Sequence, residues 1–451
     1  MLKLTLISLF LAFTSTWNLV QAGQVYIPVG EARIKKSVLA FSPTKYLGAG
    51  FDSGDSKSTA RTIRETVLAD LTLTNLFTIQ NESAFIEKPE AGLTLDAFRI
   101  SDWSTIGTEF LIKTGISITG GSFAYEVHLY DVLGSKQVLG KRYVARVEEP
   151  KLLAHTIAND LYEALTGRPG VFFTKIAMVC DKTGKKEVWT MDFDGSNPKQ
   201  LTSHRSRAIA PAWSADNRKI AYSVYTKNGR NVENIDLYEM DLKTKAARLL
   251  SNRKGINSGA AYSPNGSQIA LTMSFLGNPE IFTLNPNTRE VTRLTKSFGV
   301  DVDPSWSPDS KQIAFISTRS GAPMVYRANV EALKSNPNAA TRVTFAGSYN
   351  SATAWAPYGG KIAFSSQQNG RFDLFLINVD GSNLERLTKD EGINEDPHFS
   401  PDGNFIVFTS NRAGQKNIYM ITADGQFTRR LTYGLGNCEA PKFSWSTALP
   451  L

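Results

Sequence analysis

The sequence predicts a multidomain α/β plus all-β protein: a small N-terminal α/β domain followed by a C-terminal six-bladed β-propeller. The first observation behind this prediction is a repeated phrase. "DVDPSWSPDSKQIAFISTR", Asp301 to Arg319, returns almost unchanged as "NEDPHFSPDGNFIVFTSNR", Asn394 to Arg412. The second is that residues 23–165 lack this phrase and contain helix-like segments instead. The 451 residues, 41% of them apolar, suffice for two cores.

Three marks repeat together and define the blades. An aromatic residue recurs at spacings of 44 or 49, an Ile-Ala-like pair follows it seven positions later, and a Leu-Thr-like pair ends each unit. A period in the forties with alternating apolar residues is typical of four short antiparallel strands per unit. The "SPDG" element is expected to form the turn between the first two strands. The six aromatics are Trp213, Tyr262, Trp306, Trp355, Phe399 and Phe443.

The two ends of the repeat array predict a closed ring. The first unit starts at "KIAMVC", from Lys175, and lacks its aromatic strand, whereas an orphan "EAPKFSWS" follows the last unit from Glu439. The C-terminal strand is therefore expected to complete the first blade and to remove exposed edge strands. This gives six blades across residues 171–448.

The segment before the ring reads as an α/β domain at residues 23–165. Helices are expected at residues 59–75 and from Pro150 to Gly167, because apolar residues recur on one face and Pro and Gly mark the ends. Successive strands with glycine turns are expected between them. "TGRPG", residues 166–170, is the expected linker.

The N-terminus predicts export. Lys3, the apolar run Leu4–Phe13 and the small residue Ala22 fit a signal peptide at residues 1–22, with a mature chain from Gly23. The apolar run is too short for a permanent membrane anchor.

Composition and motifs argue against catalysis and nucleic-acid binding. Basic residues outnumber acidic ones by 50 to 42, but they are scattered, with no basic stripe beside stacking aromatics. No G-x-S-x-G or H-E-x-x-H motif and no phosphate loop occurs. We therefore expect no catalytic residue, cofactor or metal site, and favour a binding scaffold. The alternative is a propeller hydrolase acting at the central channel.

The predicted docking site is the mouth of the channel. Because the innermost strand of each blade should begin just before the aromatic, residues three to five positions upstream are expected to ring the mouth. This mouth would be polar and acidic and would attract a basic partner surface. The predicted residues are Ile209, Asn257, Ser258, Asp301, Asp303, Asn350, Ser351, Asn394, Glu395, Asp396 and Glu439.

The two cysteines, Cys180 and Cys438, lie on the strands that should close the ring. Counting outward from the turns of other blades places Cys438 opposite Asp181, one residue from Cys180. An offset of one residue points side chains to opposite faces, so a disulfide would need a bulge or a slipped register. The sequence leaves both the bonded and the free form open.

The domain order and the junction "HTIANDLYEALTGRPGVFFTKIAMV", together with "WSPDG"-type units closed by "APKFSWS", resemble the TolB family, the periplasmic components of the Tol-Pal system. The resemblance implies a non-enzymatic monomer that is peripheral to the membrane through its partners. It implies that the lipoprotein Pal docks at the propeller channel, and that the assembly supports outer-membrane integrity and cell division.

The resemblance also implies that TolA docks on the start of the mature chain. The alternation of Val25, Ile27 and Val29 fits strand addition to a partner, and it equally fits a first strand of the α/β domain. The predicted TolA-binding residues are Gly23, Gln24, Val25, Tyr26, Ile27 and Pro28.

Overall fold

The computed structural model describes residues 36–47, 54–88, 91–119, 122–146, 150–227, 233–389 and 391–445. The predicted signal peptide and the predicted TolA-binding segment, residues 23–28, lie outside the described residues. Within the described part of the chain, no helix combines the length and apolar character that a membrane crossing needs.

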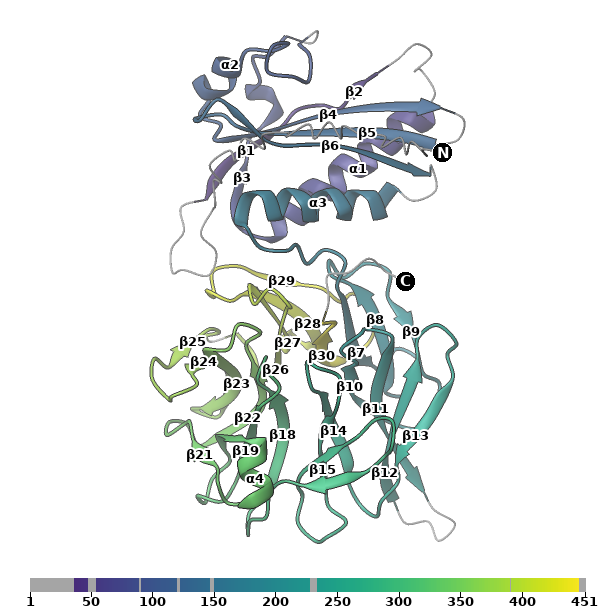
Figure 1. Ribbon diagram of the computed structural model, residues 1–451, viewed down its shortest axis with the longest axis vertical. Helices are drawn as coiled ribbons and strands as arrows, with labels where there is room; N and C mark the ends of the chain where they lie inside the picture. Colours follow the sequence, from purple (N-terminus) through teal and green to yellow (C-terminus); the bar gives the residue numbers. More distant parts are fainter. Residues whose placement is uncertain are drawn as a thin grey trace, which may run out of the picture.

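The N-terminal domain is a sheet with helices on both faces (Figure 1). Its strand order is β3-β1-β4-β5-β6, and β2 pairs with β4. Apolar residues alternate along β4, so Ile112 faces α1 and α3 while Leu111 faces α2 with Trp103. The elements are β1 (Ser37–Phe41), β2 (Lys45–Tyr46), α1 (Gly54–Leu73), β3 (Phe77–Ile79), a 3₁₀ turn (Glu82–Ala84), α2 (Ile100–Thr105), β4 (Phe110–Thr119), β5 (Ser122–Asp131), β6 (Lys136–Arg146) and α3 (Pro150–Thr166).

Both predicted helices are confirmed. Pro150 opens α3, where its fixed φ suits the first turn, and Gly167 follows its end at φ +70°. Sequence reasoning missed β1 to β3 and the short helix α2.

The C-terminal part is a six-bladed propeller of four-stranded sheets, as predicted (Figure 1). Five blades are continuous in sequence. They are β10 (Ala208–Trp213), β11 (Lys219–Lys227), β12 (Glu233–Asp241) and β13 (Ala247–Ser251); β14 (Asn257–Tyr262), β15 (Ile269–Met273), β16 (Glu280–Leu284) and β17 (Val291–Arg293); β18 (Asp301–Trp306), β19 (Gln312–Ser317), β20 (Met324–Asn329) and β21 (Thr341–Arg342), with α4 (Val330–Ser335) between the last two; β22 (Tyr349–Trp355), β23 (Lys361–Gln368), β24 (Arg371–Asn378) and β25 (Glu385–Arg386); and β26 (Asn394–Phe399), β27 (Phe405–Ala413), β28 (Gln415–Thr422) and β29 (Thr428–Arg430).

The sixth sheet, which we call the closing blade, joins the two ends of the ring. Its order is β30-β7-β8-β9, so the C-terminal strand completes a blade whose other strands open the propeller, as predicted. The strands are β30 (Cys438–Phe443), β7 (Lys175–Cys180), β8 (Glu187–Asp192) and β9 (Lys199–Gln200).

The repeated marks have structural roles. In the "SPDG" turns the Asp carboxylate accepts backbone N–H groups, as Asp309 does from Lys311 at 3.0 Å, and the fourth position takes positive φ, as at Gly403. The aromatics sit between blades: Trp306 Nε1–H donates to the Ala261 carbonyl of the preceding blade at 2.9 Å.

Every innermost strand contains a β-bulge, which the sequence did not reveal. The pairing register shifts by one residue on each of these strands. A residue three positions before the aromatic takes a φ between +51° and +65° in all six blades. The bulge residues are Ala210, Gly259, Asp303, Ala352, Asp396 and Ala440.

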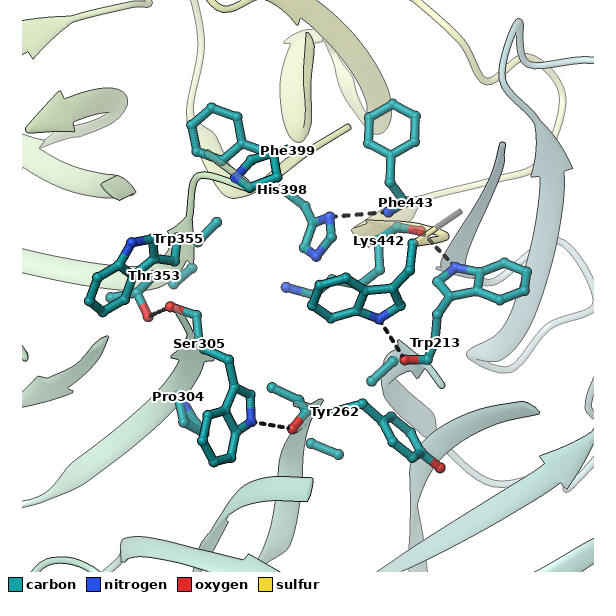
Figure 2. A pocket seen from close by; sticks show the side chains of 18 of the residues that line it. Trp213, Tyr262, Pro304, Ser305, Thr353, Trp355, His398, Phe399, Lys442 and Phe443 are labelled. Atoms are coloured by element: carbon teal, nitrogen blue, oxygen red, sulfur yellow. Dashed lines mark hydrogen bonds between the residues drawn. The ribbon is translucent and has the colours of Figure 1, made fainter. Parts of the chain in front are cut away.

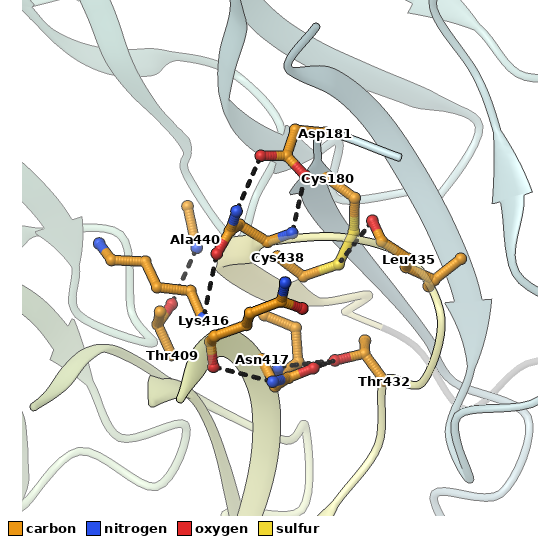
Figure 3. The surroundings of a disulfide bond; sticks show 12 residues. Cys180, Asp181, Thr409, Lys416, Asn417, Thr432, Leu435, Cys438 and Ala440 are labelled. Carbon is orange, nitrogen blue, oxygen red and sulfur yellow. Dashed lines mark hydrogen bonds between the residues drawn. A yellow bond between two sulfur atoms is a disulfide. The ribbon is translucent and has the colours of Figure 1, made fainter. Parts of the chain in front are cut away.

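The bulge corrects the predicted register of the cysteines. Counting without it placed Cys438 opposite Asp181, but the extra residue brings Cys438 opposite Cys180. The two form a disulfide, with Cα atoms 4.2 Å apart (Figure 3). Asp181 instead accepts the Asn437 backbone N–H at 2.7 Å. Both cysteines are fully buried, so the bond fastens the closing blade from within.

The α/β domain packs on the propeller through α3 and the segment after it. Tyr162 accepts a hydrogen bond from the Asn404 amide at 2.6 Å, and the Arg168 guanidinium donates to Asn404 Oδ1 at 2.9 Å. Phe172 and Phe193 meet edge to face, so one apolar core continues from α3 into the closing blade.

Candidate functional site

A cavity of about 380 Å³ lies on the axis of the ring (Figure 2). The six innermost strands and the turns that follow them supply its wall, and half of the lining residues are Ala, Gly or Pro. The bulge residues and the residues just before each aromatic line the cavity in all six blades, and in four blades the residue between them lines it too. A closed ring therefore builds one axial site from six strands.

Two bulge residues of the wall are acidic and join neighbouring blades. Asp303 Oδ2 accepts the Ala352 N–H at 3.2 Å. Asp396 Oδ2 accepts the Ala440 N–H at 3.3 Å and the Thr409 hydroxyl at 3.0 Å. Burial raises the pKa of Asp303, and the charge of Asp396 adds to this effect.

A lysine and a histidine face the same cavity one position before an aromatic. Burial lowers the pKa of Lys442, against the opposing influence of Asp396 and Asp303. Burial, followed by the charge of Lys442, holds the pKa of His398 well below its usual range, so the ring is neutral. Its Nδ1 accepts the Phe443 N–H at 3.2 Å (Figure 2).

The rim of this cavity is formed by half-buried residues four positions before each aromatic, just ahead of the bulge. We call them the rim residues: Ile209, Ser258, Val302, Ser351, Glu395 and Glu439. Glu395 and Glu439 share Lys416, with Nζ to Oε2 distances of 3.4 and 3.5 Å, and Glu439 also pairs with Lys186. The predicted acidic mouth thus consists of ion pairs rather than unpaired acids.

Burial and the neighbouring charges act in opposite directions on the pKa values of Glu395 and Lys416. Burial raises the pKa of Glu395, with Asp396 adding to it and Lys416 opposing it. Burial acts to lower the pKa of Lys416, but Glu395 and Glu439 outweigh it and raise the value. At both side chains the attraction between them thus acts against the effect of burial.

The prediction that residues five positions before the aromatic line the mouth is wrong. Asn257, Asp301, Asn350 and Asn394 are fully buried, because strand alternation turns this position into the sheets. There they contact buried side chains of the propeller: Asp301 forms an ion pair with Arg319 at 3.0 Å, and the Asn394 amide donates a hydrogen bond to Asp373 at 3.0 Å.

The remaining predicted residues divide between two levels. Asp303 and Asp396 line the cavity, and Ile209, Ser258, Ser351, Glu395 and Glu439 are rim residues. Sequence reasoning missed Lys442 and His398 in the wall and Lys186 and Lys416 at the rim. The position just before each aromatic was the available signal for the first two, since it faces opposite to the aromatic.

The described residues contain no group of three His, Cys, Asp or Glu side chains placed to hold a metal ion.

Comparison with known proteins gives a consistent family assignment. Models of the TolB β-propeller domain match residues 162–372 and 338–448, and a model of the TolB amino-terminal domain matches residues 26–138. A crystal structure of TolB from Acinetobacter baumannii superposes with a TM-score of 0.77 at 26% identity, covering 93% of this chain and 100% of that one.

Curated relatives agree over shorter alignments. The Tol-Pal system protein TolB of Desulfosudis oleivorans is 37% identical over 220 residues, which is 48% of this chain and 49% of the relative. Protein TolB homolog of Chlorobaculum tepidum is 34% identical over 233 residues, 52% of this chain and 51% of the relative. The chain thus spans about half the length of the curated relatives it matches.

Proposed function

The chain belongs to the TolB family, and we propose that it is a non-enzymatic periplasmic scaffold of the Tol-Pal system. In this proposal Pal docks at the mouth of the propeller channel, and TolA docks on residues 23–28 of the mature chain. The assembly supports outer-membrane integrity and cell division.

The observation that supports Pal docking most is the rim of the channel. A rigid ring with fixed loops around an axial cavity offers a preformed surface, which limits the entropy lost on binding. Glu395 and Glu439 hold their positions through Lys416 and Lys186. Fixed charges of both signs at a mouth favour a partner whose charges are complementary and accelerate its approach.

The test is binding of the soluble domain of Pal to the purified mature protein. The double variant Glu395→Lys/Glu439→Lys places four positive charges together at the rim, so we expect at least a tenfold weaker Kd, a slower association rate and an altered salt dependence. Glu233→Lys, on the outlying β11–β12 hairpin, is the matched control, because Glu233 is exposed and its ion pair to Lys227 is long at 3.9 Å.

The neutral variant Glu395→Gln/Glu439→Gln provides the same test if the charge-reversed variant does not fold. It should fold with an unchanged melting temperature and bind several-fold more weakly. Wild-type affinity in both folded double variants would rule out the rim as the Pal site.

TolA docking is tested separately by deleting residues 23–28. We expect TolA binding to disappear while the melting temperature stays within about 1–2 °C, since strand addition uses a segment that the core does not need. A large loss of thermal stability with TolA binding intact would show that the segment serves the α/β domain instead.

A further inference from the structure

Three charged side chains face the axial cavity from different blades. Lys442 comes from β30, Asp303 from β18 on the opposite side of the ring, and Asp396 from β26. Figure 2 shows Lys442 extending across the cavity toward Ser305 and Thr353. Charges of both signs therefore meet one enclosed space below the rim.

Each of the three retains binding capacity that the described residues do not use. The Lys442 ammonium donates no hydrogen bond to any described residue, and it forms no ion pair with one. Asp303 and Asp396 use Oδ2 to hold backbone N–H groups of the next blade, while their Oδ1 atoms accept no hydrogen bond within the described chain. An ammonium has three donors and a carboxylate about four acceptor sites, so the unused capacity is large.

The walls keep these opposite charges apart. The two carboxylates are fixed by the Ala352 and Ala440 backbone, and the Asp396 carboxylate also by Thr409. Burial opposes ionisation of both Lys442 and Asp303. A group that brings a carboxylate to the lysine and an ammonium to the aspartates would offset the cost of burying all three charges.

The cavity has the size and rigidity of a small-molecule site. A volume of about 380 Å³ lies within the usual range for such pockets. Four of the six bulge positions are Ala or Gly, namely Ala210, Gly259, Ala352 and Ala440, and these leave room at the level of the aspartates.

From this arrangement we propose that the axial cavity binds a short zwitterionic peptide of about two residues. Its carboxylate contacts Lys442 Nζ, and its ammonium contacts the Oδ1 atoms of Asp303 and Asp396. This site is separate from the rim, because neither Glu395, Glu439 nor Lys416 lines the cavity.

Calorimetry with the mature protein and L-alanyl-L-alanine tests the proposal. We expect saturable binding, at least tenfold weaker binding of the N-acetylated dipeptide and of the dipeptide amide, and at least tenfold weaker binding of the dipeptide to Lys442→Met. The amide should lose little further affinity in Lys442→Met, because it lacks the carboxylate that the lysine binds. Lys416→Met removes the same charge at the rim and should bind the dipeptide as the wild type does.

Three outcomes would overturn the proposal: no saturable binding of the free dipeptide at millimolar concentration, equal affinity for the blocked forms, or unchanged affinity in Lys442→Met. Melting temperatures establish that each variant is folded. If Lys442→Met does not fold, Lys442→Gln takes its place and is held to the same result.

Discussion

The closing blade and the continuous blades solve the same problem in different ways at one position. Five residues before the aromatic, the innermost strand must be fixed at its start. In four of the five continuous blades this position holds a buried polar residue, and in the first it holds Ala208. Asp301 is bound by Arg319, and Asn394 accepts a hydrogen bond from Arg412 at 3.0 Å. In the closing blade the same position is Cys438, joined covalently to Cys180 (Figure 3).

The difference reflects how each blade is connected. A continuous blade takes its four strands from one stretch of sequence, whereas β30 pairs with a strand whose cysteine lies 258 residues earlier. Bringing together strands so far apart closes a long loop, which costs conformational entropy. A covalent bond at the junction stabilises the contact whose separation would open the ring.

Removing the buried carboxylate of Asp301 should have the largest effect. Asp301 is fully buried and the Arg319 side chain is 16% exposed, so Asp301→Ala leaves a largely buried guanidinium without its counter-charge. We expect the free energy of unfolding to fall by about 3–5 kcal/mol, measured by urea denaturation.

Asp301→Asn is the matched variant, because in another blade an asparagine at this position, Asn394, already accepts a hydrogen bond from the equivalent arginine, Arg412. It should lose clearly less stability than Asp301→Ala. Equal losses in the two variants would mean that the polar position of continuous blades depends on charge, and not on hydrogen-bond geometry.

Breaking the disulfide should have the next largest effect. Cys180→Ala/Cys438→Ala removes a cross-link over a long loop and should lower the free energy of unfolding by about 2–4 kcal/mol. Denaturation of the wild type with and without reductant gives an independent reading, and titration of the unreduced, unfolded protein should find no free thiol. Two titratable thiols, or identical denaturation curves, would contradict the closure role.

A smaller effect is expected from the hydrogen bonds of the aromatics. Trp306→Phe deletes a donor that bridges two blades and should cost about 0.5–1.5 kcal/mol. Trp355→Phe is the control, since Trp355 Nε1–H donates to Gly359 in its own turn at 2.9 Å. A larger loss from Trp355→Phe would show that contacts between blades are not what the indole N–H provides.

The smallest effect concerns the α/β domain near the closing blade. Burial acts to lower the pKa of His155, but its ion pair with Asp70 at 2.7 Å outweighs this and raises it. A raised folded-state pKa gives stability that is complete below about pH 6.5 and is lost as pH rises through the folded value. We expect the melting temperature to fall by about 2–4 °C as pH rises through that window. His155→Gln should remove this pH dependence. A wild-type melting temperature that does not change with pH would exclude the stabilising role of the His155–Asp70 pair.

The fold was largely predictable because it rests on periodic features. The three repeated marks determine blade number, turn type and ring closure, and the orphan "APKFSWS" locates β30. Helices α1 and α3 follow from apolar periodicity with Pro and Gly at the ends of α3.

The site was only partly predictable, because a bulge residue with no sequence signature changes the direction in which the neighbouring side chains point. The bulge residue is Ala in three blades, Asp in two and Gly in one, so no residue type signals it. Without the bulge, counting placed Cys438 opposite Asp181 and buried positions such as Asn257 at the mouth. The two rim lysines were missed because they lie outside the innermost strands. Lys186 directly precedes β8 and Lys416 lies in β28, and neither belongs to one of the three repeated sequence marks.

The six bulges also determine which positions of the innermost strands face the channel. An uninterrupted strand gives alternate residues to the channel, but here a half-buried rim residue is followed directly by a bulge residue that lines the channel in every blade. Asp303 and Asp396 hold the backbone of the next blade, whereas Ala210, Ala352 and Ala440 carry no polar side-chain group to form such a contact. Substitutions at these three alanines can thus change what the channel binds while leaving the hydrogen bonds between blades in place.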